Sequence, residues 1–134
     1  MAKITTIEGI GEAYAEKLMA TGVTTVEGLL EVAGTRAGRA ELAQQTGIRA
    51  DLLLGWVNRA DLHRIRGVGE EYADLLEAAG VDTVPELAQR NPQNLHARLL
   101  EVNEERSLVR RVPPLNQVQD WVAQAKELPR KIEY

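Results

Sequence analysis

The sequence predicts an all-helical protein made of two copies of one unit, with eight or nine short helices in all. Apolar residues recur at helical spacing along most of the chain, and no segment alternates over enough residues to form a convincing strand. Residues 7–30 match residues 65–88 at a constant offset of 58 without a gap, and 13 of these 24 pairs are identical. A self-match of this length indicates an internal duplication.

The duplication also predicts the domain organisation. A weaker match at an offset of 65 pairs Trp56-Val57-x-x-Ala60 with Trp121-Val122-x-x-Ala125. We expect a first unit over residues 1–64, a second over 65–128 and a tail over 129–134, with the two units sharing one core. The apolar positions retained by the repeat give the expected buried side chains, which are Leu18, Leu29, Leu53, Trp56, Leu76, Leu87, Leu99 and Trp121.

The first copy carries start and stop signals for four helices. Gly22 can end the first helix in a left-handed conformation, and Thr24 or Thr25 can cap the second. The third helix is expected from Thr35 to Gly47-Ile48, and the fourth over about residues 50–62.

The second copy has matching signals. Thr83 is expected to cap a helix, and Asn91-Pro92 to begin the next. Asn103 is expected to cap a further helix, which Pro113-Pro114 would break. The last helix should stop at Pro129, and the tail after it is expected to be extended, either making an edge contact or lying disordered.

Each copy contains a Gly-x-Gly hairpin in the same apolar frame. The first is Ile4-x-x-Ile7-x-Gly9-Ile10-Gly11-x-x-x-Ala15-x-x-Leu18, and its twin is Leu62-x-x-Ile65-x-Gly67-Val68-Gly69-x-x-x-Ala73-x-x-Leu76. Both glycines of a pair are expected to make a tight turn that a Cβ atom would obstruct, while Ile10 or Val68 inserts into the core. The second glycine opens a helix whose free N–H groups could hold an anion.

This pattern resembles the helix-hairpin-helix motif. That family typically binds DNA without sequence preference, through backbone N–H groups that contact phosphates. Nearly the whole chain is similar to an uncharacterised bacterial family of tandem helix-hairpin-helix-related proteins, on residues 55–105 and 108–130. The resemblance implies two tandem helix-hairpin-helix (SAM-like) units and leaves the activity open.

Acidic residues follow both hairpins. DNA-binding hairpins usually place Pro, Lys, Arg or a small polar residue after the second glycine, but here Glu12-Ala13 and Glu70-Glu71 follow it. Residues 67–89 include six acidic residues and no Lys or Arg. A carboxylate about 6 Å from a phosphate would cost roughly 1–3 kcal/mol. We therefore expect the hairpins to be fold-defining turns and poor phosphate sites.

Two arginine clusters are the better candidates for contacts with a nucleic acid or another partner. They are Arg59, Arg64 and Arg66 near the repeat junction, and Arg106, Arg110 and Arg111 further along. In the second cluster Arg106 and Arg110 are spaced one helical turn apart, and glutamates at 101, 104 and 105 lie close by. Helix salt bridges are the simpler interpretation of that cluster.

No catalytic, metal or cofactor site is evident. The sequence has no Cys, its only Ser is Ser107, and His63 and His96 occupy non-equivalent repeat positions. We expect both histidines at the surface, with His63 in a solvated helix end, in preference to a role as ligand or base. We expect Trp56 and Trp121 in the core, with base stacking as the alternative. Tyr14 and Tyr72 are expected to be structural, although their hydroxyls could instead close the hairpin or contact a ligand. The chain is thus predicted not to be an enzyme, with no small-molecule substrate.

Two functions compete. The net charge of −4 weakens a nucleic-acid role without excluding it, since a local basic patch can suffice. A protein–protein interaction or scaffold module, bound to another protein or to itself, ranks first. A DNA- or RNA-binding protein without sequence preference is the alternative. No leader or membrane segment is evident, and absence of Cys fits a reducing compartment, so the cytoplasm is the expected location.

Overall fold

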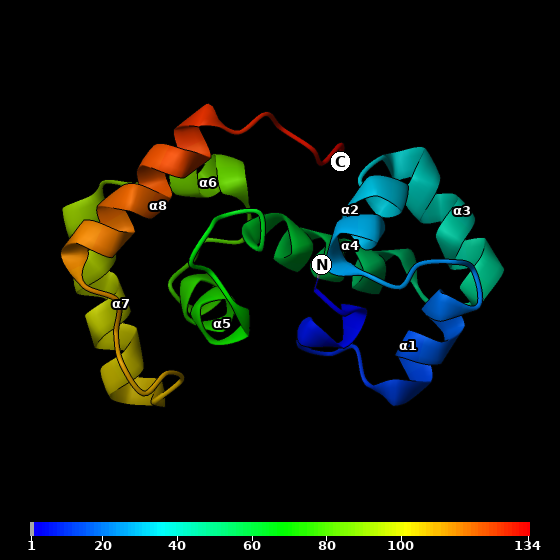
Figure 1. The fold of residues 1–134 in the computed structure, drawn as a ribbon, viewed down its shortest axis with the longest axis horizontal. Helices are drawn as coiled ribbons and strands as arrows, with labels where there is room; N and C mark the ends of the chain where they lie inside the picture. Colours follow the sequence, from blue (N-terminus) through cyan, green and yellow to red (C-terminus); the bar gives the residue numbers. More distant parts are fainter. Residues whose placement is uncertain (1) are drawn as a thin grey trace. The chain divides into compact units, whose positions relative to one another are not determined.

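The structure is a computed structural model that describes residues 2–134, and these residues are helical as predicted (Figure 1). They form no strand, and a single isolated bridge joins Lys3 to Thr25. The elements in order are the 3₁₀ helix η1 (Ile4–Thr6) and eight α-helices: α1 (Glu12–Met19), α2 (Val26–Ala33), α3 (Arg36–Thr46), α4 (Ala50–Leu62), α5 (Glu70–Ala78), α6 (Val84–Ala88), α7 (Pro92–Arg106) and α8 (Leu115–Glu127).

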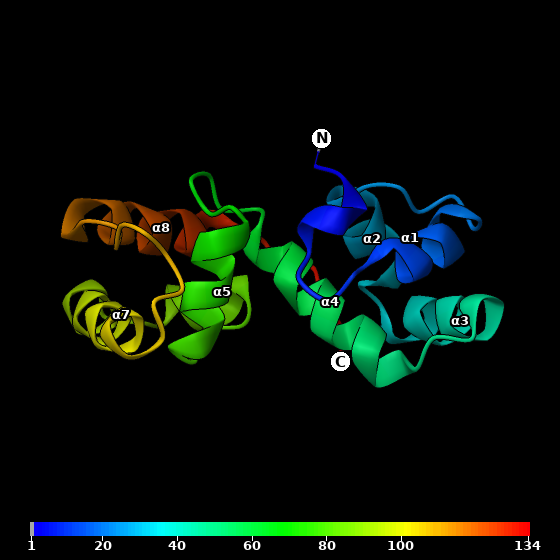
Figure 2. The same cartoon turned by 90° about the horizontal axis from the view of Figure 1, so that it is seen from below.

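The chain divides into two compact units. The first contains the residues up to Asp61 together with Lys131–Tyr134, and the second contains Leu62–Arg130. In the first unit α2 packs against α3, and in the second α8 packs against both α6 and α7 (Figures 1 and 2). The segment 131–134 thus belongs to the first unit, although it follows the last helix of the second in the sequence.

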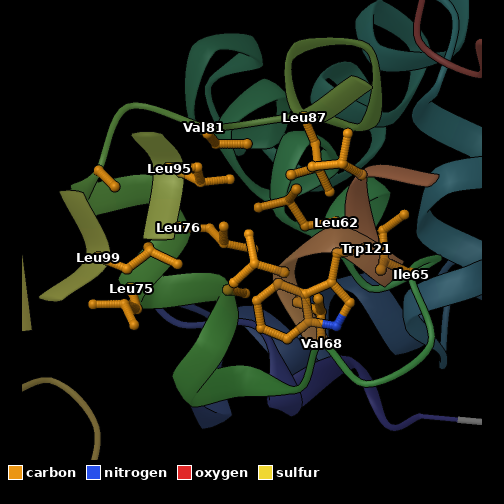
Figure 3. Packing of buried hydrophobic residues seen from close by; sticks show 14 of the residues in the cluster. Leu62, Ile65, Val68, Leu75, Leu76, Val81, Leu87, Leu95, Leu99 and Trp121 are labelled. Atoms are coloured by element: carbon orange, nitrogen blue, oxygen red, sulfur yellow. The ribbon is translucent and has the colours of Figure 1, made fainter. Parts of the chain in front are cut away.

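Each unit has a hydrophobic core of its own, so the expectation of one shared core is wrong. The reason is that each unit has its own tryptophan and enough aliphatic side chains to enclose it. Figure 3 shows Trp121 in the core of the second unit beside Leu62, Ile65 and Val68. All eight side chains expected in the interior are buried, which confirms that list.

Local signals fix the helices of the first unit. The backbone of Gly22 has a φ of +94° after α1, and the Val23 N–H donates to the Leu18 carbonyl, as expected for a left-handed helix end. Thr25 caps α2 by accepting from the Gly28 N–H at 2.9 Å. Thr35 caps α3 in the same way, and Gly47 ends it with a φ of +75°. These expectations are confirmed.

The second unit departs from expectation at two caps. Thr83 precedes α6 but its hydroxyl accepts no backbone hydrogen bond; it donates to the Glu86 carboxylate at 3.1 Å. Asn103 begins no helix, because α7 runs through it to Arg106. Its amide instead donates to the Val109 carbonyl at 3.1 Å and accepts from the Val109 N–H at 2.9 Å. Asn103 therefore fixes the loop that follows α7.

Candidate functional site

The two hairpins have the same local geometry. The Ile10 N–H donates to the Ile7 carbonyl, and the Val68 N–H donates to the Ile65 carbonyl, both at 3.1 Å. Ile10 and Val68 are buried, as expected for the apolar residue of each turn. The turn therefore points its middle side chain inward and leaves its two glycines outside.

Only the first glycine of each pair is required by the turn. Gly9 and Gly67 have φ values of +95° and +97°, and a Cβ atom there would meet the indole Nε1 of a tryptophan at 3.1 and 2.9 Å. Gly11 and Gly69 have extended backbones, with φ values of −81° and −97°, and no atom lies within 4 Å of a Cβ built on either. The expectation that both glycines are needed is wrong, since the second one faces open space.

That second glycine is the N-cap of the helix that follows it. Gly11 precedes α1 and Gly69 precedes α5, and neither helix start has a side-chain cap. Glu12, Glu70 and Glu71 are in the first turns of these helices, and all three are exposed. Their negative charges complement the positive end of each helix dipole. Each open helix start therefore carries its own anion.

An aromatic pair underlies each hairpin. The ring centroids of Tyr14 and Trp56 are 5.1 Å apart, with 65° between the ring planes. Those of Tyr72 and Trp121 are 5.3 Å apart, with 59° between the planes. Both tryptophans are buried, which confirms the core interpretation. The Tyr72 hydroxyl donates to the Arg111 carbonyl at 3.1 Å, so it contacts the loop after α7 and does not close the hairpin.

The first arginine cluster is largely used within the fold. Arg59 is buried in α4. Arg64 donates to the Pro129 carbonyl at 2.8 Å. The backbone N–H of Arg66 donates to Oε1 of Gln124 at 2.8 Å, and Nε2 of Gln124 donates to the Arg66 carbonyl at 3.1 Å. Arg66 is nevertheless exposed. Of the three, Arg66 alone is exposed as a whole residue.

The second arginine cluster is exposed. Arg106 ends α7, and Ser107 turns the chain with a φ of +51°, so the expected one-turn helical spacing of Arg106 and Arg110 is wrong. Within residues 2–134, none of Arg106, Arg110 and Arg111 has an ion pair, so the helix salt bridges are absent as well. The left-handed turn removes Arg110 and Arg111 from the helix. Arg106 remains in the helix, but Val102 and Asn103 are at the positions four and three residues before it, where a helix salt bridge would need a carboxylate.

Two other polar residues are placed differently from expectation. Asp61 is only 1% exposed, so the end of α4 beside His63 is not solvated. Arg39, which was not among the residues expected to matter, is only 5% exposed. A signal for it existed, because Arg39 and the buried Leu42 are three residues apart and share a face of α3. An arginine on the apolar face of a short helix indicates a buried partner.

The described residues offer little other chemistry. In the part of the chain that the structure describes, no three His, Asp or Glu side chains form a group that could hold a metal ion. None of the helices described is both long and apolar enough to cross a membrane.

A family model described as a domain of unknown function, DUF4332, matches residues 8–128. No solved structure matches the chain.

Proposed function

We propose that this chain, which belongs to the DUF4332 family, is a non-enzymatic protein–protein interaction module built from two helix-hairpin-helix units. The observation that carries the proposal is the charge at the hairpins. Both open helix starts carry exposed glutamates, Glu12 in the first unit and Glu70 with Glu71 in the second. Such a surface disfavours a phosphate and favours a partner that offers cationic or hydrogen-bonding groups.

The partner in this proposal is another protein or a second copy of the chain. Helix surfaces with a net negative charge attract complementary protein surfaces and repel nucleic acid. The net charge of −4 acts in the same direction.

A nucleic-acid-binding function is the second candidate. One observation favours it: Arg106, Arg110 and Arg111 are exposed and, in the described part of the chain, have no ion pair. Such arginines are available to contact phosphates without sequence preference.

A salt series separates the two functions. Fluorescence anisotropy would follow a labelled DNA duplex titrated with the full chain at several salt concentrations. For an interaction module, binding should be no tighter than the nonspecific range of about 10⁻⁴–10⁻⁶ M at physiological salt. Replacement of Arg106, Arg110 and Arg111 by Ala should then leave binding unchanged relative to a variant with the same charge change elsewhere. Alanine at Lys17, Arg36 and Arg49, which are all exposed in the first unit, provides that control.

The opposite result would favour nucleic acid. Submicromolar binding by the wild type, abolished in the Arg106, Arg110 and Arg111 variant but kept in the control, would overturn the proposed function. The salt slope should then also flatten by about one unit for each phosphate that the variant no longer binds.

A further inference from the structure

The segment 131–134 occupies a groove on the first unit. The Glu133 N–H donates to the Gly34 carbonyl at 2.8 Å. The Ile132 side chain is 4% exposed and belongs to the core of the first unit. The Tyr134 hydroxyl donates to Oδ1 of Asn58 at 3.2 Å. A short extended peptide is therefore held at its backbone, by one aliphatic side chain and by one tyrosine.

Arg39 is the main polar group of this groove. Its Nη1 donates to the carbonyls of Ala33 and Gly34, at 3.1 and 3.0 Å, at the C-terminal end of α2. A guanidinium at this position complements the negative end of the helix dipole. Its Nη2 donates to the Glu133 carbonyl. One nitrogen is thus fixed by the helix, and the other is directed to the peptide.

Gly34 allows the peptide backbone to approach. A Cβ atom at this position would lie 2.8 Å from the Lys131 carbonyl oxygen. The groove, which we define as Gly34, Arg39, Asn58 and the pocket filled by Ile132, therefore recognises four features. These are a backbone N–H for Gly34, a backbone carbonyl for Arg39, a tyrosine hydroxyl for Asn58, and an aliphatic side chain. The backbone contacts place no demand on the side chains at 131 and 133.

A cavity of about 250 Å³ adjoins this groove. Arg39 and Tyr134 both line it, together with Ala40, Ala50 and Leu54. The tyrosine at the end of the docked segment therefore has open space beside it, and the site is not closed over its occupant.

We infer that the groove is an exchangeable peptide site and that its second occupant is residues 131–134 of another copy of this chain. The contacts named above come from the segment and the groove, so a second copy can supply the same ones. Exchange of an identical segment between copies creates no new interface and needs only a different path for the connecting residues. The inference deepens the proposed function, on which it rests, by naming a second copy as the partner.

Occupation within one chain competes with exchange. A tethered segment reaches an effective concentration on the order of millimolar, so a segment from a second copy must displace it. The apparent affinity equals the intrinsic affinity multiplied by the fraction of grooves that are free. A groove filled nine-tenths of the time therefore binds a second segment about tenfold more weakly than an empty groove. Removal of the tethered competitor should therefore expose the site.

The first test uses a fluorescent peptide of residues 129–134 and three full-length proteins. The variant Ile132→Asp keeps the groove but disables its own segment, because a carboxylate is costly in an apolar pocket. It should bind the peptide at least about tenfold more tightly than the wild type. Leu100→Asp places the same residue at an exposed position in the second unit and should bind like the wild type. A peptide with Asp in place of Ile should not bind.

The second test mixes two complementary full chains. The isotope-labelled variant Ile132→Asp has a free groove. The unlabelled variant Arg39→Lys has an intact segment 131–134, but it lacks the arginine guanidinium that binds this segment in its own groove. At about millimolar concentration, where effective and bulk concentrations become comparable, the amide resonances of Gly34 and Arg39 in the labelled chain should move toward their wild-type positions. Labelled Ile132→Asp mixed with unlabelled Ile132→Asp should show no change. Ile132→Ala replaces Ile132→Asp where the aspartate unfolds the chain.

Two results would overturn the inference. One is equal peptide binding by wild type and Ile132→Asp, and the other is no resonance shift in the complementary mixture. In either case segment 131–134 binds only the groove of its own chain. Neither result bears on DNA binding, so failure of exchange leaves the proposed interaction function intact with a different partner, whereas failure of that function appears in the salt series.

Discussion

Gly67 lies against the indole of Trp121, and a Cβ atom on Gly67 would be 2.9 Å from Nε1 of that ring. Gly9 and Trp56 have the same relationship in the first unit, at 3.1 Å. Nε1 of Trp121 is buried and has no hydrogen-bond partner in the described chain, so packing holds the ring there. The glycines repeat at an offset of 58 and the tryptophans at 65. In each unit the structure therefore places the repeated glycine against the repeated tryptophan.

This relationship predicts opposite effects of one substitution at two neighbouring glycines. Gly67→Ser should lower the free energy of unfolding by about 1–3 kcal/mol, because the residue has a left-handed φ and its side chain would meet Trp121. Gly69→Ser should raise it by about 0.5–1 kcal/mol, because a serine at an open N-cap accepts a backbone hydrogen bond and restricts the unfolded chain. Urea unfolding followed by circular dichroism measures both.

The first unit provides a repeat of the same comparison, with Gly9→Ser and Gly11→Ser. Equal losses of stability at Gly67 and Gly69 would contradict the assignment of the turn to the first glycine alone. They would also restore a structural need for the second glycine.

A second prediction concerns the start of α2. Thr25→Ala should cost about 0.5–2 kcal/mol, because it removes the hydroxyl that accepts from the Gly28 N–H. Thr24→Ala is the matched control, since Thr24 is exposed and, among residues 2–134, only its backbone carbonyl forms a hydrogen bond, with the Ile4 N–H at 3.3 Å. Thermal unfolding distinguishes them, and a larger loss of stability for Thr24→Ala would show that the wrong threonine has been assigned as the cap.

A third prediction concerns the loop after α7. Asn103→Ala removes both hydrogen bonds to the Val109 peptide group and should cost about 1–2 kcal/mol. The amide of Val109 should also exchange faster with solvent, because it loses its acceptor. Asn116→Ala, at an exposed position of α8, is the control and should leave Val109 unchanged. Unchanged exchange at Val109 in Asn103→Ala would contradict the role assigned to this side chain.

Most local features of the fold were predictable, with the cap expected at Thr83 as an exception, and features that depend on distant residues were not. The caps at Thr25, Thr35 and Asn91 act within three residues along the chain. Spacing therefore located two of them, and it placed the first at Thr24 or Thr25. Burial of the two tryptophans followed from the apolar residues around them. The end of α7 is also local but was not predicted, because it depends on a left-handed serine, a conformation that few residues other than glycine adopt.

The candidate site was less predictable, for a related reason. The sequence indicated two equivalent glycines in each hairpin. Their roles differ because the first glycine has a left-handed φ and lies against a tryptophan far along the chain, whereas the second is extended and faces open space. Arg39 is buried because it contacts both the end of α2 and Glu133, which is 94 residues away. Its place in α3 marks it as unusual but does not identify its partner.

The last prediction tests whether charge alone keeps phosphate from the hairpins. Glu12→Lys and Glu70→Lys each replace a negative charge by a positive one at an open helix start. Because no atom lies within 4 Å of a Cβ built on Gly11 or Gly69, a phosphate has room to approach. Each variant should strengthen binding to duplex DNA by about tenfold, which corresponds to about 1.4 kcal/mol.

Glu16→Lys is the control for this comparison. It makes the same charge change at an exposed position of α1 beyond the first turn, so it reports the effect of net charge without the helix start. A gain for Glu12→Lys well above that for Glu16→Lys, measured by anisotropy at several salt concentrations, is the expected result. Equal gains would mean that the helix starts are not accessible anion sites. The glutamates would then not be what separates this chain from helix-hairpin-helix proteins that bind DNA.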